Sequence, residues 1–174
     1  MRNQLVAIEL SAVDRHTVIV KTLVWADEDA TRDFAIRLAQ RPEVADCFVS
    51  LHGDLGAGKT TFVRHLLQAL GVTGRIKSPT YAVVEPYELP GLNIWHFDFY
   101  RFADPREWED AGFRDIFASP GLKLAEWPEK AGRLLPMPDL ELTLITQDDS
   151  ARRVAMAART PKGAGLLARL ETHE

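Results

Sequence analysis

Apolar positions recur with two different periods along this chain, and the two kinds of segment alternate in its first half. A helical period of three to four residues runs from Asp27 to Gln40 and again from about Lys59 to Leu70, which predicts two helices. Asp27 suits the N-cap of the first helix, and Gly71 suits the position just after the second. Short apolar or β-branched runs predict strands at 4–10, 16–25, 46–51, 80–87, 92–99 and 121–126.

The rest of the chain continues this pattern, with strands dominating the second half. Asp104-Pro105-Arg106-Glu107 has the form of a capped helix start with proline at the first helical position. Two strands are expected, one on each side of residues 148–150, and a helix is expected near 162–172. The turn signals Asp14-Arg15 and Leu89-Pro90-Gly91 predict an N-terminal hairpin and a second hairpin in mid-chain. The overall expectation is an α/β fold with a mixed sheet.

Composition sets limits on the class of protein. The chain has 174 residues, of which 46% are hydrophobic and 26% charged, as expected for one globular domain. Its formal net charge of -4 argues against a surface that holds nucleic acid unaided, so any link to RNA is expected to run through a partner. The single cysteine, Cys47, lies in an apolar run and is expected to pack in the core. No apolar stretch reaches membrane-spanning length, and no signal peptide is recognisable, so a cytoplasmic protein is expected.

One motif carries most of the chemical information. Gly53-Asp54-Leu55-Gly56-Ala57-Gly58-Lys59-Thr60 matches the phosphate-binding P-loop pattern, between an apolar strand and an amphipathic helix. Glycines let successive backbone N–H groups point inward at phosphate oxygens, and the following helix presents its positive end to the same anion. Lys59 is expected to reach the β- and γ-phosphates, and the Thr60 hydroxyl to bind Mg²⁺. Nucleotide binding is therefore predicted.

A P-loop protein completes its magnesium shell with a carboxylate, usually at the end of an apolar strand. Both Asp98 and Glu126 end such runs, and their spacing does not choose between them. Thr80, which follows Ser78-Pro79, is a candidate switch residue for the γ-phosphate, although an ordinary turn before a strand is the preferred interpretation of this segment taken alone. His52, Trp95 and His96 are expected to have structural roles.

Five segments together resemble the TsaE (YjeE) family, the ATPases of bacterial tRNA threonylcarbamoyladenosine biosynthesis. The resemblance covers about residues 24 to 170. The segments are Gly53-Asp-Leu-Gly-Ala-Gly-Lys-Thr-Thr-Phe62, Lys77-Ser-Pro-Thr-Tyr81, Glu85-Pro-Tyr87, His96-Phe-Asp-Phe-Tyr-Arg101 and Glu126-Trp-Pro-Glu129. It implies a P-loop NTPase-like single domain with a mixed central sheet flanked by helices. Residues 1–23 precede the usual family start, so they are expected to form an added β-hairpin packed on a P-loop ATPase domain at 24–174.

The resemblance also implies a function and a set of roles. The family works with two partner subunits, of TsaB and TsaD type, that transfer a threonylcarbamoyl group to N6 of the adenosine beside the tRNA anticodon. By resemblance, ATP and Mg²⁺ are the cofactors, and Lys59, Thr80, Asp98 and Glu126 are the catalytic residues. Thr60 and Glu126 would hold Mg²⁺. The residues implied to bind ATP are Glu28, Thr31, Leu55, Gly56, Ala57, Gly58, Lys59, Thr60, Thr61, Trp127 and Arg152.

Other classes of P-loop protein fit less well. A GTPase needs an Asn-Lys-x-Asp motif, whereas the only asparagines are Asn3 and Asn93. A small-molecule kinase closes an arginine-rich lid over the phosphates, but the expected lid position, 128–138, offers only Lys130 and Arg133. A module that holds ATP without hydrolysing it remains an alternative. Partner contacts are expected around 78–80 and 101–115, because a nucleotide-dependent change in a switch segment has an effect only if a partner contacts it.

Overall fold

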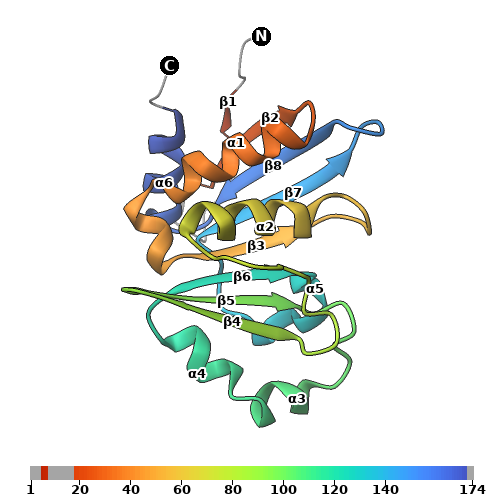
Figure 1. The fold of residues 1–174 in the computed structure, drawn as a ribbon, viewed down its shortest axis with the longest axis vertical. Helices are drawn as coiled ribbons and strands as arrows, with labels where there is room; N and C mark the ends of the chain where they lie inside the picture. Colours follow the sequence, from red (N-terminus) through yellow and green to blue (C-terminus); the bar gives the residue numbers. More distant parts are fainter. Residues whose placement is uncertain (1–4, 8–17, 172–174) are drawn as a thin grey trace.

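The computed structural model describes residues 5–7 and 18–171, and these form one mixed sheet with helices on both faces (Figure 1). Within the described residues the sheet has eight strands, in the order β1-β2-β8-β7-β3-β6-β5-β4. The strands are β1 (Leu5–Ala7), β2 (Ile19–Trp25), β3 (Phe48–His52), β4 (Val84–Leu89), β5 (Leu92–Asp98), β6 (Leu122–Glu126), β7 (Leu140–Thr146) and β8 (Arg152–Ala158). The helices are α1 (Glu28–Ala39), α2 (Lys59–Leu70), α3 (Pro105–Asp110), α4 (Phe113–Ala118), α5 (Pro128–Ala131) and α6 (Pro161–Glu171), with 3₁₀ turns η1 (Pro42–Asp46) and η2 (Gly132–Leu134). The predicted α/β class is confirmed.

Four neighbouring strands at the centre of the sheet run parallel, and this arrangement positions the site. β3 pairs in parallel with both β6 and β7, and β6 pairs in parallel with β5. β2, β8 and β4 join by antiparallel pairing, as does the short β1 beside β2. Because the central strands share one direction, their carboxyl ends lie at one edge of the sheet, where α/β proteins bind ligands.

Side-chain alternation along the strands builds two cores, one on each face of the sheet. On one face, Val49 and Leu51 of β3 pack with Phe34 of α1 and Phe62 of α2. On the other face, Phe97 of β5 packs with an aromatic cluster from α3, α4 and the loop before them, at the lower end of the molecule in Figure 1. Each buried phenylalanine contributes roughly 1.5–3 kcal/mol by removing apolar area from water. Both layers therefore hold the sheet that carries the P-loop.

Several elements differ in detail from the sequence expectation. The strand predicted at 80–87 begins only at Val84, because Thr80–Ala82 form a turn closed by Val83 N donating to Pro79 O at 2.7 Å. Pro90 and Gly91 form the expected hairpin turn, with Gly91 at φ +73°. The helix α4 had no counterpart among the predicted elements. β1 pairs antiparallel with β2, while the turn predicted at Asp14-Arg15 lies outside the described residues.

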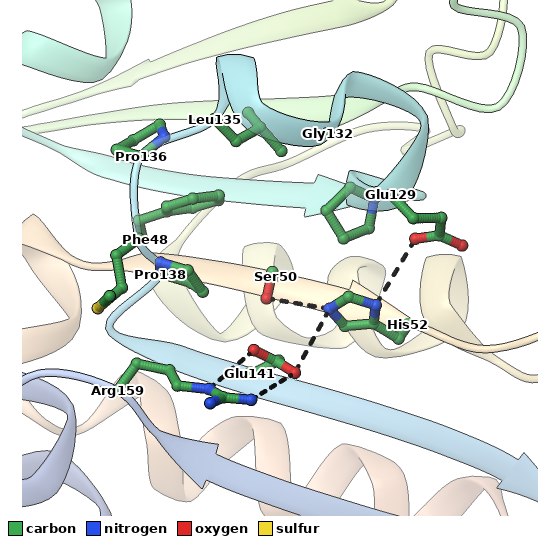
Figure 2. Close-up of a pocket in the computed structure, with 12 residues that line it drawn as sticks. Phe48, Ser50, His52, Glu129, Gly132, Leu135, Pro136, Pro138, Glu141 and Arg159 are labelled. Atoms are coloured by element: carbon green, nitrogen blue, oxygen red, sulfur yellow. Dashed lines mark hydrogen bonds and ion pairs between the residues drawn. The ribbon is translucent and has the colours of Figure 1, made fainter. Parts of the chain in front are cut away.

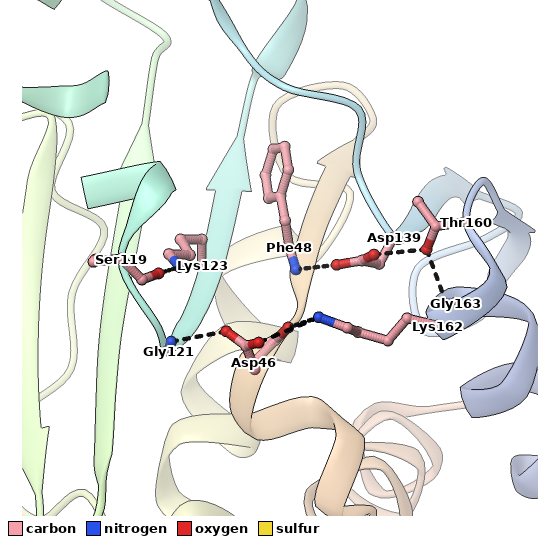
Figure 3. A network of polar contacts seen from close by, with 9 residues as sticks. All are labelled: Asp46, Phe48, Ser119, Gly121, Lys123, Asp139, Thr160, Lys162 and Gly163. Carbon is pink, nitrogen blue, oxygen red and sulfur yellow. Dashed lines mark hydrogen bonds and ion pairs between the residues drawn. The ribbon is translucent and has the colours of Figure 1, made fainter. Parts of the chain in front are cut away.

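The amino ends of the central strands are tied together by two aspartates (Figure 3). Asp139 accepts hydrogen bonds from Phe48 N at 2.8 Å and from the Thr160 hydroxyl at 2.6 Å, joining β3 to the start of α6. Asp46 accepts from Gly121 N at 3.1 Å and lies 3.3 Å from Lys162 Nζ. The Gly121 N–H and the Lys162 ammonium both hold the pKa of Asp46 below its ordinary value. These contacts connect three segments that are far apart in sequence.

Cys47 lies in the core on the α1–α2 face, as its apolar surroundings predicted. Burial and the nearby Asp139 carboxylate raise the pKa of its thiol to about 12. The thiol is therefore protonated at neutral pH and unreactive as a nucleophile. Within the part of the chain that the structure describes, no helix is long and apolar enough to cross a membrane.

Candidate nucleotide-binding site

The P-loop connects the carboxyl end of β3 to the start of α2, as its sequence context predicted. Gly53 has φ +142°, and a Cβ there would lie 2.5 Å from the carbonyl oxygen of Leu144, so only glycine fits. Gly58 adopts φ +102° at the N-cap of α2, which again requires glycine. The loop thus turns the first N–H groups of a 12-residue helix toward the space above the sheet edge. A helix N-terminus in this position favours bound phosphate.

Lys59, the first residue of α2, is almost fully enclosed although its ammonium lies at the edge of a cavity. Its Nζ donates to the carbonyl oxygens of Gly53 and, at 3.0 Å, of Asp54, and it lies 4.1 Å from the centre of the Trp127 ring. Burial lowers the pKa of Lys59, while the Glu126 carboxylate is the strongest of several acidic groups that oppose this effect. A lysine held by loop carbonyls and a ring face can exchange those contacts for phosphate oxygens.

Thr60 and Glu126 lie together, as the predicted magnesium pair requires. The Thr60 hydroxyl donates to Glu126 Oε1 at 2.8 Å, and Glu126 is only 2% exposed at the end of β6. His96 Nε2 lies 2.6 Å from the other carboxylate oxygen and fixes its orientation from β5. His96 was expected to be structural; it is fully buried, yet it contacts the candidate metal ligand.

Asp98 and Thr80 form a second pair beside the first. β5 and β6 are in register so that Asp98 lies opposite Glu126. Asp98 Oδ2 accepts from the Ser78 hydroxyl and, at 3.2 Å, from the Thr80 hydroxyl, while Oδ1 accepts from Tyr100 N at 2.9 Å. Ser78 also donates to Glu126 at 3.3 Å, so the two carboxylates share one hydroxyl. The sequence left Asp98 and Glu126 as alternatives, whereas the fold brings both to the same place.

A cavity of about 350 Å³ lies over these groups. Arg152, at the start of β8, closes one side of it, since its Nε donates to the Ala57 carbonyl at 2.9 Å. Most of the predicted site residues line this cavity, and Ser78 and Tyr100 join them: the lining is Leu55, Gly56, Ala57, Gly58, Lys59, Thr60, Thr61, Ser78, Thr80, Asp98, Tyr100, Glu126, Trp127 and Arg152.

The two remaining predicted residues, Glu28 and Thr31, line an adjoining cavity of about 290 Å³. Ala57, Gly58, Thr61 and Arg152 line both cavities, so the two meet at the P-loop. Glu28 lies 3.0 Å from His65 Nε2, and Thr31 is buried in the first turn of α1. Trp25, Asp149 and Ser150 also line this second cavity. Sequence reasoning missed them because no local motif marks a residue that only the sheet order brings to the loop.

A third cavity, of about 490 Å³, shares no lining residue with the first (Figure 2). His52 lines this cavity between two carboxylates, with Nδ1 3.6 Å from Glu129 and Nε2 3.9 Å from Glu141. Arg159 Nε lies 3.1 Å from Glu141. The charged groups of this cavity are thus paired with one another, and the wall opposite them is apolar (Figure 2).

The P-loop between a parallel strand and its helix, with a hydroxyl and two strand-end carboxylates beside it, defines a P-loop nucleotide-binding protein. A sequence model of the family described as "Threonylcarbamoyl adenosine biosynthesis protein TsaE" matches residues 25–154. The chain belongs to this family.

Individual relatives agree with this assignment. The TsaE protein of Haemophilus influenzae is 46% identical over 119 residues, covering 68% of this chain and 75% of the relative. The TsaE protein of Bacillus subtilis is 33% identical over 141 residues, covering 80% and 87%. Both are named tRNA threonylcarbamoyladenosine biosynthesis proteins. The crystal structure of Bacillus subtilis YdiB superposes with a TM-score of 0.72 at 26% identity, covering 91% of this chain and 98% of that one.

Proposed function

We propose that this chain is a P-loop ATPase that binds ATP and Mg²⁺ and acts with subunits of TsaB and TsaD type. Its role is in forming the threonylcarbamoyl group on N6 of the tRNA adenosine beside the anticodon, in the cytoplasm. Membership of the TsaE family supports the pathway. The observation that carries the ATPase assignment is the convergence of the P-loop, the Thr60–Glu126 pair and the Thr80–Asp98 pair on one cavity.

In this proposal the P-loop backbone from Leu55 to Thr61 binds the phosphates, and Lys59 neutralises their charge. Arg152 adds a second cation beside the loop, held by the Ala57 carbonyl. Glu28 and Thr31 approach the nucleoside end from α1, because their cavity adjoins the phosphate cavity. The ring of Trp127 packs against the Lys59 ammonium beside this site.

The donor set beside Lys59 fits magnesium. Thr60 and Glu126 offer only oxygen atoms, which Mg²⁺ prefers, and His96 orients the carboxylate. Among the described residues no group of three or more His, Cys, Asp or Glu side chains could hold a metal ion. Phosphate and water oxygens would therefore complete the shell, as is usual for Mg²⁺ in nucleotide sites. Bound there, the ion would neutralise charge that develops on the phosphates.

Asp98 and Thr80 are assigned to hydrolysis. Asp98 is nearly buried and accepts from two hydroxyls and one backbone N–H, so its carboxylate is held in one orientation. A carboxylate in this position can orient and deprotonate an attacking water. Thr80 would act as a switch residue that couples the γ-phosphate to the segment 78–82.

We also propose that residues 1–23 are an extension and that residues 24–174 form the ATPase domain. Antiparallel pairing of β1 with β2 supports an extension that adds strands at the edge of the sheet.

The test is Mg²⁺-dependent ATP hydrolysis, measured with and without purified TsaB- and TsaD-type subunits. We expect the partners to stimulate hydrolysis, and Lys59→Ala to weaken nucleotide binding. Asp98→Asn should keep nucleotide affinity within about threefold and lower the hydrolysis rate by about 100-fold or more, the range for a lost general base.

Three results would contradict the proposal. Absence of stimulation with tight ATP binding retained would indicate a nucleotide-binding module. Phosphoryl transfer to a small molecule in place of water would indicate a kinase. Equal loss of nucleotide affinity in Lys59→Ala and Asp98→Asn would contradict the separation of binding from hydrolysis.

A further inference from the structure

A fourth cavity, of about 420 Å³, adjoins the phosphate site on the outer side of α2 and differs from it in charge. One wall is the helix stripe Thr60, Arg64 and Gln68, spaced at four-residue intervals. The other wall is the loop after α2, from Gly74 to Ser78. Three of its lining side chains, Arg64, Arg75 and Lys77, are cationic, and no lining residue is acidic.

These three cations lack carboxylate partners within the described part of the chain. By contrast, Arg32, Arg106 and Lys162 each lie within 3.3 Å of an aspartate oxygen. In a chain with net charge -4, a compact group of three uncompensated cations is a local positive field that favours an anion.

The backbone of the loop that carries Arg75 and Lys77 is anchored to the core. Val72 and Ile76 are 9% and 5% exposed and pack into the core beside α2. Because Ile76 points inward, its neighbours Arg75 and Lys77 are left exposed. Gly74 has φ +88°, which lets the loop turn back along the helix toward Thr60.

The inner end of the cavity is shared with the phosphate site. Thr60 and Ser78 line both cavities. The hydroxyl of Ser78 contacts Asp98 and Glu126, and that of Thr60 contacts Glu126. An occupant that displaced the Ser78 segment would therefore change the surroundings of the two carboxylates assigned to magnesium binding and hydrolysis.

We propose that this basic cavity, lined by Arg64, Arg75 and Lys77, binds an acidic segment of a partner protein and couples it to the ATPase site. The inference rests on the proposed partner-dependent ATPase function. An aspartate- or glutamate-rich segment fits better than RNA. Proteins hold RNA helices by contacts along an extended stretch of backbone and single strands in basic grooves with aromatic stacking platforms, whereas this cavity is compact, with three cations and no aromatic lining residue.

The experiment compares two charge-reversal variants of the full chain with equal changes in net charge. Arg75→Glu/Lys77→Glu changes the cavity. Arg133→Glu/Arg153→Glu is the control, since both arginines are exposed and line none of the cavities described above. Affinity for the TsaB- and TsaD-type subunits is measured at low and high salt, with ATP affinity and thermal melting as checks of the fold.

We expect the cavity variant to lose partner affinity by about tenfold or more and to lose most of the salt dependence, as removal of complementary charges does. Its ATP affinity and basal hydrolysis should match wild type, and the control should keep partner binding. Arg75→Lys/Lys77→Arg should also keep it.

Other outcomes overturn the inference. Partner binding and stimulation retained in the cavity variant would remove the cavity from the interface while leaving the ATPase proposal intact. An equal loss of partner affinity in both charge-reversal variants would indicate that net charge, and not the cavity, determines partner binding. Loss of binding to a labelled tRNA transcript by the cavity variant, with partner affinity unchanged, would assign the cavity to RNA. Failure of the wild type to bind or respond to the partners would refute the proposed function and this inference with it.

Discussion

Two buried lysines, Lys59 and Lys123, have nearly the same immediate surroundings but lie at opposite ends of the sheet. Each ammonium donates to a backbone carbonyl, Gly53 for one and Ser119 for the other. Each also lies against a tryptophan ring, at 4.1 Å from Trp127 and 5.4 Å from Trp95. Burial lowers the pKa of both. A buried lysine on an aromatic face is therefore not by itself a sign of function.

What differs is the wider setting. Lys59 begins a helix after a glycine-rich turn, lines a cavity and has two strand-end carboxylates nearby. Lys123 lies within β6, and the hydrogen bond that it donates to Ser119 joins that strand to the end of α4 (Figure 3). The carboxyl end of the sheet thus presents side chains with exchangeable partners, while the amino end uses similar side chains to connect elements. Substitutions at the two ends of the sheet should therefore change different properties of the protein.

The largest difference between substitutions at the two lysines is expected in nucleotide affinity. Lys59→Ala should weaken ATP binding by about 10- to 100-fold, since a hydrogen bond to a charged group contributes roughly 1.5–3 kcal/mol. Lys123→Ala should leave the affinity unchanged. Titration calorimetry with both variants measures this, and a comparable loss in Lys123→Ala would end the functional distinction.

The free energy of unfolding should fall more in Lys123→Ala than in Lys59→Ala. Lys123→Ala removes a buried stem and leaves the Ser119 carbonyl without its donor, so the free energy of unfolding should fall by about 2 kcal/mol. Lys59→Ala should have a smaller effect, because water can enter its cavity and solvate the freed carbonyls. Urea denaturation of the two variants provides the comparison. A larger loss of unfolding free energy in Lys59→Ala would mean that the contacts of Lys59 in the P-loop also stabilise the fold.

The effect of Mg²⁺ on ATP affinity should differ between substitutions of acidic residues at the carboxyl and amino ends of the sheet. Glu126→Gln keeps the shape of the side chain but loses the charge that Mg²⁺ requires, so the gain in ATP affinity on adding Mg²⁺ should shrink by about tenfold. Asp139→Asn, at the amino end, should lower stability and leave this gain unchanged. If the magnesium effect were intact in Glu126→Gln, the residue would not be a ligand.

The smallest effect is expected at Asp46. Its pKa in the folded protein lies below the ordinary value of 3.8, so the stability that it contributes is fully present above that pH and is lost as the pH falls through the lowered pKa. The difference in unfolding free energy between wild type and Asp46→Asn should stay below about 1 kcal/mol, as for an exposed ion pair. It should be constant from neutral pH to about pH 5 and narrow below about pH 4. A difference that widened on acidification would contradict the assignment.

The sequence predicted the elements that depend on local chemistry. α1, β3, the P-loop, α2 and the β4–β5 hairpin fall close to their expected positions, because capping, period and glycine placement act over a few residues. The start of β4 was expected four residues too early, since residues 79–83 form a turn closed by a hydrogen bond from Val83 to Pro79. α4 was missed because its burial depends on aromatic residues of other elements.

The site residues likewise fall into those that local spacing predicts and those that it does not. The P-loop residues could be predicted because their spacing is itself the motif. His96, Ser78 and Tyr100 could not, since each acts through a carboxylate that lies elsewhere in the chain or in the next turn. The choice between Asp98 and Glu126 was open by spacing alone, and parallel pairing of β5 with β6 shows that both reach the cavity.

Residue spacing was therefore enough to predict the phosphate-binding loop, its helix and the family to which the chain belongs. The tertiary structure alone decided which distant groups complete the site: Glu126 beside Thr60, 66 residues away, and Arg152 on the Ala57 carbonyl, 95 residues away. It also decided that three cations of α2 and the following loop gather in one cavity beside the carboxylates. The physical reason is that strand order and register arise from packing across the whole sheet, and no local period encodes them.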